Sequence, residues 1–186
     1  MNASILNQLQ HGDLRTKGES EKVVQEVLSN PHLVAELFSG VFIPDPGLRL
    51  RCSDALAKVA HHNPPLLQPY THVLIDTVST IDQQEVQWHL AEIISLIELD
   101  QQDQEKAVTF LLRFLETTKS NIVKVFSLQA LTDIARRNNT FKGTTIRVIK
   151  QEMEQGAPSI VSRGKKLLKL LENEPSPSDQ TPPDDT

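Results

Sequence analysis

Aromatic residues and cysteine are scarce in this chain of 186 residues. Aromatic side chains make up 4% of it, as six Phe, one Trp and one Tyr, and Leu, Ile and Val dominate the apolar residues. Such aliphatic material fits packed helices better than sheets, which favour aromatic and β-branched residues. The single cysteine, Cys52, excludes a disulfide framework and a cysteine-based zinc site.

Long apolar runs are missing as well. No run reaches the roughly 18 residues that a membrane-spanning helix needs. The first residues also lack the basic and then apolar pattern of a signal peptide. We therefore expect a soluble, cytoplasmic protein with no membrane partner.

Charge is unevenly distributed along the chain. Residues 1–123 carry 9 basic and 16 acidic side chains, residues 124–172 carry 10 and 4, and residues 173–186 carry none and 4. The net charge of −5 is thus the sum of an acidic array, a basic block and an acidic tail. The tail also holds four prolines and no aliphatic residue, so we predict that residues 173–186 are disordered.

Apolar residues recur at helical spacing through most of the chain. Turns that contain proline, such as Asn30-Pro31 and Asn63-Pro64-Pro65, separate the periodic segments. Short connections between the segments imply antiparallel neighbours. The pattern predicts an all-α protein with helices at 4–10, 19–29, 33–41, 48–60, 66–81, 85–99, 104–117, 121–135, 144–154 and 158–171.

One set of apolar positions repeats four times at a period of 37 or 38 residues. The three apolar columns are Leu48, Val86, Val123 and Ile160; Leu56, Ile94, Leu131 and Leu168; and Val59, Ile97, Ile134 and Leu171. A fourth column, mostly of small residues, is Cys52, Leu90, Ser127 and Gly164. Within each unit these positions share one helical face. A helical hairpin repeated at this length is typical of a solenoid, whose hairpins complete their cores by stacking.

Residues 45–56, with the sequence DPGLRLRCSDAL, resemble the HEAT-repeat pattern. In that pattern an Asp-Pro turn leads to an aliphatic-Arg pair, a small residue three positions on and a Leu seven positions on. Here the pair is Leu48-Arg49, the small residue is Cys52 and the Leu is Leu56. Asp45 and Arg49 are interpreted as residues that tie the turn to the start of the helix.

The resemblance extends over most of the chain. Weaker copies of the pair stand at 86–87 and 123–124, and the stretches 9–15, 85–91 and 128–131 are similar to small bacterial HEAT-repeat proteins of unassigned activity. The repeat is slightly short for HEAT, which leaves armadillo-like relatives open. The resemblance implies an α-solenoid of about four HEAT-like hairpins at 31–172 behind N-terminal capping helices at 1–30. It also implies a scaffold or adaptor that binds another protein.

In such a solenoid, as the resemblance implies, the second helix of each hairpin lines the concave side. The exposed stripe of these helices is therefore the candidate surface for a protein partner. The candidate residues are Arg51, Asp54, Trp88, His89, Glu92, Phe126 and Gln129. Trp and Arg are favoured at interface hot spots because they bury much area and keep polar atoms. The alternatives are that Trp88 packs between hairpins, and that Arg51 with Asp54 and His89 with Glu92 form local i, i+3 ion pairs.

The basic block supports a second hypothesis, nucleic-acid binding. Its candidate residues are Arg136, Arg137, Arg147, Lys150, Arg163, Lys165 and Lys166. Clustered on one surface, they would attract phosphates, and HEAT-like DNA alkylation-repair glycosylases offer an analogy. Against it, the basic residues occupy one end only, and aromatic residues that could hold a base are few. The structural alternatives are a solvated helix pair and an acidic tail that folds over it. A third hypothesis is an assembly factor similar to HEAT-type pigment lyases.

Motifs that carry chemistry are missing or incomplete. His89 and Glu92 form one His-x-x-Glu pair, which supplies two metal ligands at most. His61-His62 precedes a Pro-Pro stop and is interpreted as a solvated helix end, and Cys52 as a packing residue on the buried face. The chain has no Gly-rich phosphate loop and no Ser-His-Asp order that suggests hydrolysis. We therefore expect no enzymatic activity, no cofactor and no metal site.

Overall fold

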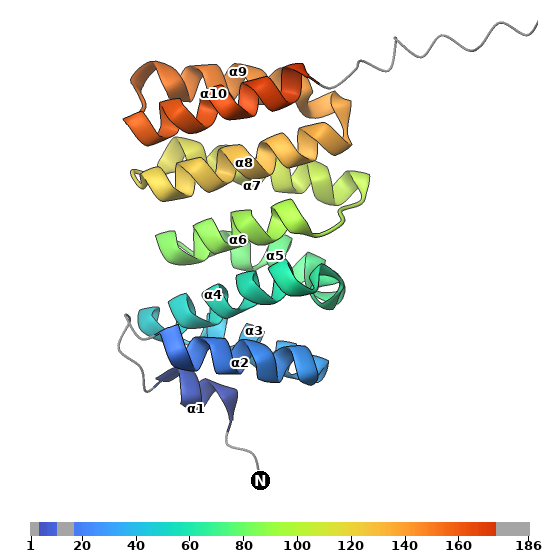
Figure 1. Ribbon diagram of the computed structural model, residues 1–186, viewed down its shortest axis with the longest axis vertical. Helices are drawn as coiled ribbons and strands as arrows, with labels where there is room; N and C mark the ends of the chain where they lie inside the picture. The colour runs from blue at the N-terminus through green and yellow to red at the C-terminus, as the bar shows by residue number, and fades with distance from the viewer. Residues whose placement is uncertain (1–3, 11–16, 174–186) are drawn as a thin grey trace, which may run out of the picture.

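A computed structural model describes residues 4–10 and 17–173. These residues form ten α-helices and no strand (Figure 1), which confirms the all-α prediction. The predicted disordered tail, from residue 174 on, and residues 11–16 of the predicted cap lie outside the described residues. The helices are α1 (Ile5–Gln10), α2 (Lys17–Ser29), α3 (Val34–Phe42), α4 (Pro46–His62), α5 (Thr71–Asp76), α6 (Gln84–Leu96), α7 (Gln101–Thr117), α8 (Asn121–Arg137), α9 (Lys142–Gln155) and α10 (Pro158–Glu172).

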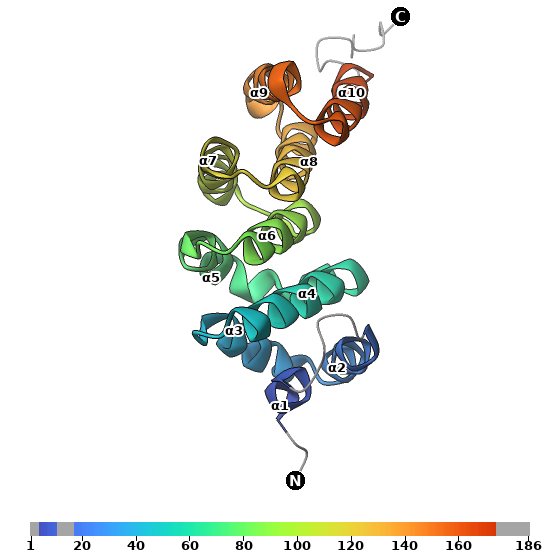
Figure 2. The same cartoon turned by 90° about the vertical axis from the view of Figure 1, so that its left-hand side faces the viewer.

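The helices pack in two layers along the long axis of the molecule. Helices α4, α6, α8 and α10 lie side by side in chain order and form what we call the front layer (Figure 1). Helices α3, α5, α7 and α9 form the rear layer (Figure 2). At the N-terminal end, α1 and α2 pack against α4. In the side view α6 and α8 are set back relative to α2 and α10, so the front layer together with α2 has a shallow inward curve (Figure 2).

The repeated apolar columns form the core between the two layers. Every member of the three columns is buried except Leu168 in α10, the last described helix, which is half-buried. The column of Cys52, Leu90, Ser127 and Gly164 is buried throughout. At Gly164 an added Cβ would lie 2.5 Å from the sulfur of Met153, so the missing side chain permits the close approach of α9 to α10.

The start of α4 is fixed as its sequence predicts. Asp45 is the N-cap, and its Oδ1 accepts a hydrogen bond of 3.0 Å from the backbone N–H of Leu48. Pro46 occupies the first helical turn, where its missing N–H costs nothing. Arg49 Nε donates to the carbonyl oxygen of Ile43 at 2.9 Å. Asp45 and Arg49 therefore tie the turn to the helix, as predicted.

The predicted helix at 66–81 is wrong. This segment consists of the short helix α5 flanked by 3-10 turns at Pro64–Leu66, Gln68–Tyr70 and Val78–Thr80. Pro69 lies inside the predicted span, and its ring and missing N–H do not permit an α-helix to run through. The rear layer is therefore least regular at α5.

Helix α6 also ends earlier than predicted, at Leu96 rather than near residue 99. Two nitrogens of Arg137, on α8, donate to the carbonyl oxygens of Ile97 and Ser95 at 2.7 and 3.0 Å. Side chains of this type satisfy the last carbonyl groups of a helix and oppose its dipole. A neighbouring helix thus caps α6, which no local pattern in the α6 sequence indicates.

Candidate functional site

The outward side of the front layer carries the predicted binding stripe. On α8, Ile122, Phe126, Gln129 and Asp133 stand at i, i+4, i+7 and i+11, which brings them to one side of the helix. All four are exposed or half-buried. Four predicted residues on the other front-layer helices are half-buried: Arg51, Asp54, Trp88 and Glu92. The stripe is therefore open to solvent along most of the layer, with His89 as the exception.

The ion pairs of this stripe differ from those predicted. The alternative to partner binding was that Arg51 pairs with Asp54 and His89 with Glu92, three residues apart on one helix. Instead, Lys58 Nζ lies 2.6 Å from Asp54 Oδ2, and His61 Nε2 lies 2.7 Å from Glu92 Oε1. The first contact joins two residues four positions apart on α4, and the second joins α4 to α6. His61 and His62 are both exposed, as predicted for a helix end, and His61 also contacts Glu92.

His89 is buried, which corrects its assignment to the exposed stripe. The residue is 7% exposed and its side chain lies between α6 and α4, with Nδ1 2.9 Å from Ser53 Oγ and Nε2 3.8 Å from Asp54 Oδ1. Burial lowers the pKa of His89 below its ordinary value, and the charges of Asp54 and Glu92 oppose that shift. His89 therefore joins two helices and offers no contact to a partner.

Ser53, His89 and Asp54 are the three residue types of a hydrolase triad, but their surroundings do not suit a nucleophilic serine. Ser53 Oγ is 3.0 Å from the carbonyl oxygen of Leu50 as well as 2.9 Å from His89. A hydroxyl has one proton, so Ser53 donates either to the Leu50 carbonyl oxygen or to His89 Nδ1, according to the tautomer of the imidazole. A nucleophilic serine needs histidine as its base and access to a substrate. Ser53 is buried, so this group serves as a polar contact between α4 and α6.

The polar contacts between front-layer helices follow the sequence repeat. His89 of α6 faces Asp54 of α4, and Arg163 of α10 donates to Gln129 Oε1 of α8 at 2.5 Å. Arg163 is displaced from His89 by two repeats, and Gln129 from Asp54 by the same two repeats. At the α6–α8 junction the equivalent position is Phe126. The series of polar contacts between front-layer helices is therefore interrupted at the middle of the layer.

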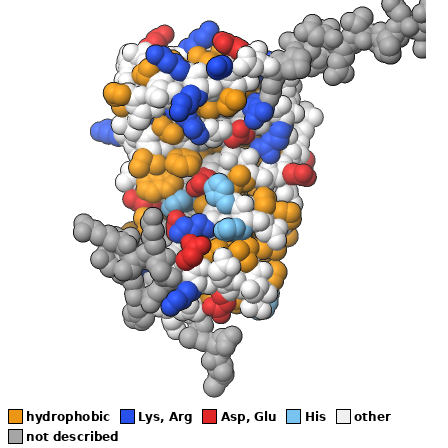
Figure 3. All heavy atoms as spheres, viewed as in Figure 1, with side chains coloured by type: hydrophobic (Ala, Val, Ile, Leu, Met, Phe, Trp, Pro, Cys, Tyr) orange, Lys and Arg blue, Asp and Glu red, His pale blue; other side chains and the backbone are white. Residues whose placement is uncertain are grey.

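An apolar surface lies at this interruption. Ile122 is 50% exposed, and Trp88, Val125 and Phe126 are half-buried against the core. We call these four residues the apolar interval. Figure 3 shows a hydrophobic patch over the N-terminal halves of α6 and α8, with acidic, basic and histidine side chains below it. The Trp88 ring packs edge-on to His89 at 5.2 Å, so Trp88 is both packed and partly accessible.

Two residues of the predicted basic surface are occupied by contacts within the fold. Arg137 binds the end of α6, as described above, and its Nε donates to the Asp133 carbonyl oxygen. Arg163 donates to the neutral side chain of Gln129, which also donates to Asp133, and no carboxylate of the described residues lies within ion-pair distance of Arg163. Arg137 is therefore a capping residue of α6, whereas Arg163 still contributes charge to the stripe.

The remaining basic residues are exposed but lie on different surfaces. Arg136 belongs to α8, and Arg147 and Lys150 belong to α9 in the rear layer. Lys165 stands one repeat after Leu128, which is fully buried, yet Lys165 is exposed because no described helix follows α10. Only Arg163 and Lys166 continue the stripe of the front layer. The predicted basic set is thus divided among the rear, the end and the front of the molecule.

Cys52 is a packing residue, as predicted. Its side chain is fully buried, and burial raises the pKa of its thiol to about 12. An added Cβ at Gly40 would lie 2.4 Å from the Cys52 sulfur, so α3 approaches α4 closely at this point. The thiol is therefore protonated at neutral pH and enclosed by helices.

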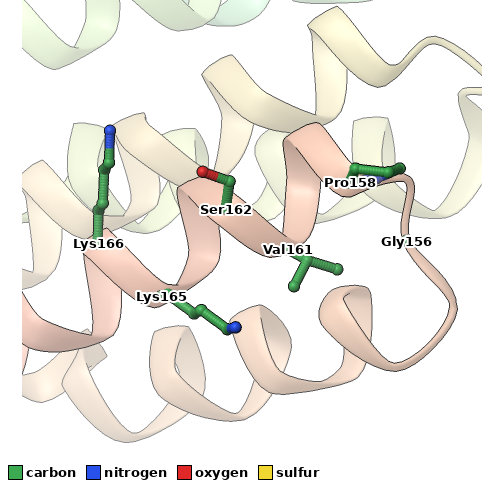
Figure 4. Close-up of a pocket in the computed structure, with 6 residues that line it drawn as sticks. All are labelled: Gly156, Pro158, Val161, Ser162, Lys165 and Lys166. Carbon is green, nitrogen blue, oxygen red and sulfur yellow. The ribbon is translucent and has the colours of Figure 1, made fainter.

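An open depression at the turn between α9 and α10 is lined by Gly156, Pro158, Val161, Ser162, Lys165 and Lys166. Figure 4 shows that Lys165 and Lys166 point away from each other, so their charges do not converge on one ligand. In the part of the chain that the structure describes, no three His, Cys, Asp or Glu side chains gather as a metal site would require. No described helix is long and apolar enough to cross a membrane.

A scan against protein-family models and searches of curated proteins and of solved structures found no match. The assignment of the site therefore depends on this chain alone. Sequence reasoning missed Ile122, Val125, Ser53 and Lys58. Ile122 could have been found, since it stands four residues before Phe126 on the same helical side, whereas the contacts of Ser53 and Lys58 depend on how the helices pack.

Proposed function

We propose that this chain is a solenoid of HEAT-like hairpins that acts as a non-catalytic scaffold and binds another protein through its front layer. The observation that carries the proposal is the apolar interval, an apolar patch on the front layer that lies beside charged and histidine side chains. Apolar side chains at the centre of a polar rim are the usual composition of a protein interface. The inward curve of the front layer supports the same reading (Figure 2).

The stacking of the helices supports the solenoid. Each front-layer helix packs against the next one along the chain, and the repeated columns fall between the layers. Such an array offers an extended surface rather than a cleft, which suits a protein partner better than a small molecule.

The test compares two variants that place the same charge on two exposed apolar residues. Ile122 is 50% exposed on the front layer, and Phe42 is 41% exposed at the end of α3 in the rear layer. The wild-type chain and the two variants, Ile122→Glu and Phe42→Glu, are immobilised and exposed to an extract of the source organism. Circular dichroism first establishes that both variants are folded.

We expect a protein that the wild type and Phe42→Glu capture and Ile122→Glu does not. That protein, once identified and purified, should bind the wild-type chain in calorimetry and lose at least about tenfold in affinity with Ile122→Glu. Equal capture by both variants, with both folded, would show that the front layer is not the binding surface.

Nucleic-acid binding is the second candidate, favoured by the exposed Lys165, Lys166 and Lys169. Among the described residues no carboxylate lies within ion-pair distance of these three side chains. Short duplex and single-stranded DNA are titrated at about 50 mM salt, where phosphate contacts are strong. Binding that weakens steeply with added salt supports this candidate, and its absence at low salt removes it.

A further inference from the structure

We propose that the front layer receives an acidic protein segment, with a large apolar side chain on the apolar interval and a carboxylate over Arg163 and Lys166 of α10. The inference rests on the proposed function and specifies the chemistry of the partner. It follows from the position of the apolar interval between two charged regions of one surface.

The apolar part of the site lies where the series of polar contacts between neighbouring front-layer helices is interrupted. At the other two junctions the equivalent residues, His89 and Arg163, reach a polar side chain on the preceding helix. Phe126 makes no such bond, and Glu92, the register equivalent of Asp54 and Gln129, binds His61 instead. An incoming apolar side chain thus meets Phe126 and Ile122 without displacing a polar contact.

The charged part of the site lies immediately beside it. Gln129, one turn after Phe126 on α8, is the residue that accepts from Arg163, so the apolar interval and the basic side of α10 are contiguous. Arg163 is held by the neutral amide of Gln129, which in turn donates to Asp133. Among the described residues no carboxylate lies within ion-pair distance of Arg163 or Lys166. Both positive charges are therefore available to a carboxylate of a partner.

The opposite side of the apolar interval fixes the direction of the segment. Glu85 and Glu92 are the charged residues of the α6 stripe, and they would repel carboxylates placed over α6. The acidic part of the partner therefore lies toward α10. Adjacent packed helices are about 8–10 Å apart and an extended chain advances about 3.3 Å per residue, so the apolar anchor and the first carboxylate are about three residues apart.

The last fourteen residues of this chain do not meet this description. They carry four acidic residues but no aliphatic or aromatic side chain, so they supply the carboxylates without the anchor. The chemistry points to a segment of another protein, of the form apolar-x-x-acidic.

The probe is a fluorescein-labelled peptide that contains Leu-Phe-Ser-Ser-Glu-Glu, titrated with the full chain and followed by fluorescence anisotropy. Two matched peptides replace either the Leu-Phe pair with Ala-Ala or the Glu-Glu pair with Lys-Lys. We expect binding of the first peptide with Kd below about 1 mM. Each matched peptide should bind at least about tenfold more weakly.

Matched protein variants locate the site. Ile122→Ala and Lys166→Glu should each weaken binding of the first peptide by about fivefold or more, and Lys166→Glu should improve binding of the Lys-Lys peptide. Lys150→Glu makes the same charge change on an exposed residue of the rear layer and should have no effect. Ile122 and Lys166 are both exposed, so loss of the fold is not expected, and circular dichroism checks this.

Four results would overturn the inference: no binding of the first peptide, equal binding of the Lys-Lys peptide, insensitivity to Ile122→Ala, or loss of binding with Lys150→Glu. Two other occupants are examined directly. Oligo(dT) that binds through Lys166 while the peptide does not would assign the basic residues to nucleic acid. A concentration-dependent dimer abolished by Ile122→Glu would assign the apolar interval to a second copy of this chain. A protein captured through Ile122 that competes with none of the peptides would refute this inference and leave the proposed function standing.

Discussion

Two buried serines of the front layer should respond in opposite directions to the same substitution. Ser127 on α8 is fully buried, and its hydroxyl has no hydrogen-bond partner among the described residues. Ser53 on α4 is buried as well, but its hydroxyl contacts the carbonyl oxygen of Leu50 and the imidazole of His89. We expect Ser127→Ala to raise the free energy of unfolding and Ser53→Ala to lower it.

The expected magnitudes follow from the two environments. A buried hydroxyl without a partner costs about 1–3 kcal/mol, and alanine removes that hydroxyl with little change in volume. Alanine also has the higher helix propensity, by a few tenths of a kcal/mol, at both positions. We therefore expect Ser127→Ala to stabilise the chain by about 1–2 kcal/mol. Ser53→Ala leaves the buried His89 Nδ1 without its partner and should destabilise the chain by about 1–2 kcal/mol.

Urea unfolding measures both effects. Trp88 is the only tryptophan and lies on α6, which packs against both α4 and α8, so its fluorescence reports on the environment of each serine. With an m-value of about 2 kcal/mol per molar urea, a change of 1 kcal/mol moves the midpoint by about 0.5 M. Far-ultraviolet circular dichroism provides the second probe that a two-state treatment requires. Destabilisation by Ser127→Ala, or equal shifts for the two variants, would refute the reasoning.

Three further predictions concern His89, Cys52 and Arg137. Burial holds the folded-state pKa of His89 below 6.5, so its contribution to stability is complete above about pH 6.5 and is lost as the pH falls through the folded-state pKa; urea midpoints between pH 8 and 5 should decline less for His89→Gln than for the wild type. Cys52, with its pKa raised to about 12, should resist iodoacetamide in the folded chain and react once urea unfolds it; equal rates in both states, measured by mass spectrometry, would contradict its burial. Arg137→Ala should lower the free energy of unfolding by about 1–2 kcal/mol, because carbonyl groups at the end of α6 lose a charged donor, whereas Lys150→Ala should stay within about 0.5 kcal/mol in the same urea titration.

The repeated apolar columns and the capping residues predicted the fold well in the segments that contain them. The columns that begin at Leu48 and Val59 identified the buried side of the front layer, because one helical face must be covered wherever it is apolar. Asp45 and Arg49 fixed the start of α4 from their residue types alone. The failure at 66–81 has an equally local cause, since Pro69 lies within this span and disfavours a continuous α-helix.

The contacts of the site were less predictable because they join residues on different helices. Spacing on one helix favours Arg51 with Asp54 and His89 with Glu92. It contains no information on the distance between helices, which brings His61 to Glu92 and Ser53 to His89. For the same reason the sequence could not separate the buried His89 from the half-buried Trp88 beside it. The order of the columns was predictable, but the burial of their individual members was not.

The basic block shows why a charge pattern along a sequence is not a charge pattern on a surface. Lys165 stands at the position of the repeat that the buried Leu128 occupies one repeat earlier. No described helix covers Lys165, so this position can carry a charge. Arg147 and Lys150 lie in the rear layer, and Arg137 caps α6. The positive charge that adjoins the apolar interval is therefore reduced to Arg163 and Lys166. Two charges beside an apolar patch suit a short acidic segment with an apolar anchor, whereas a nucleic-acid backbone would gain from a longer basic track.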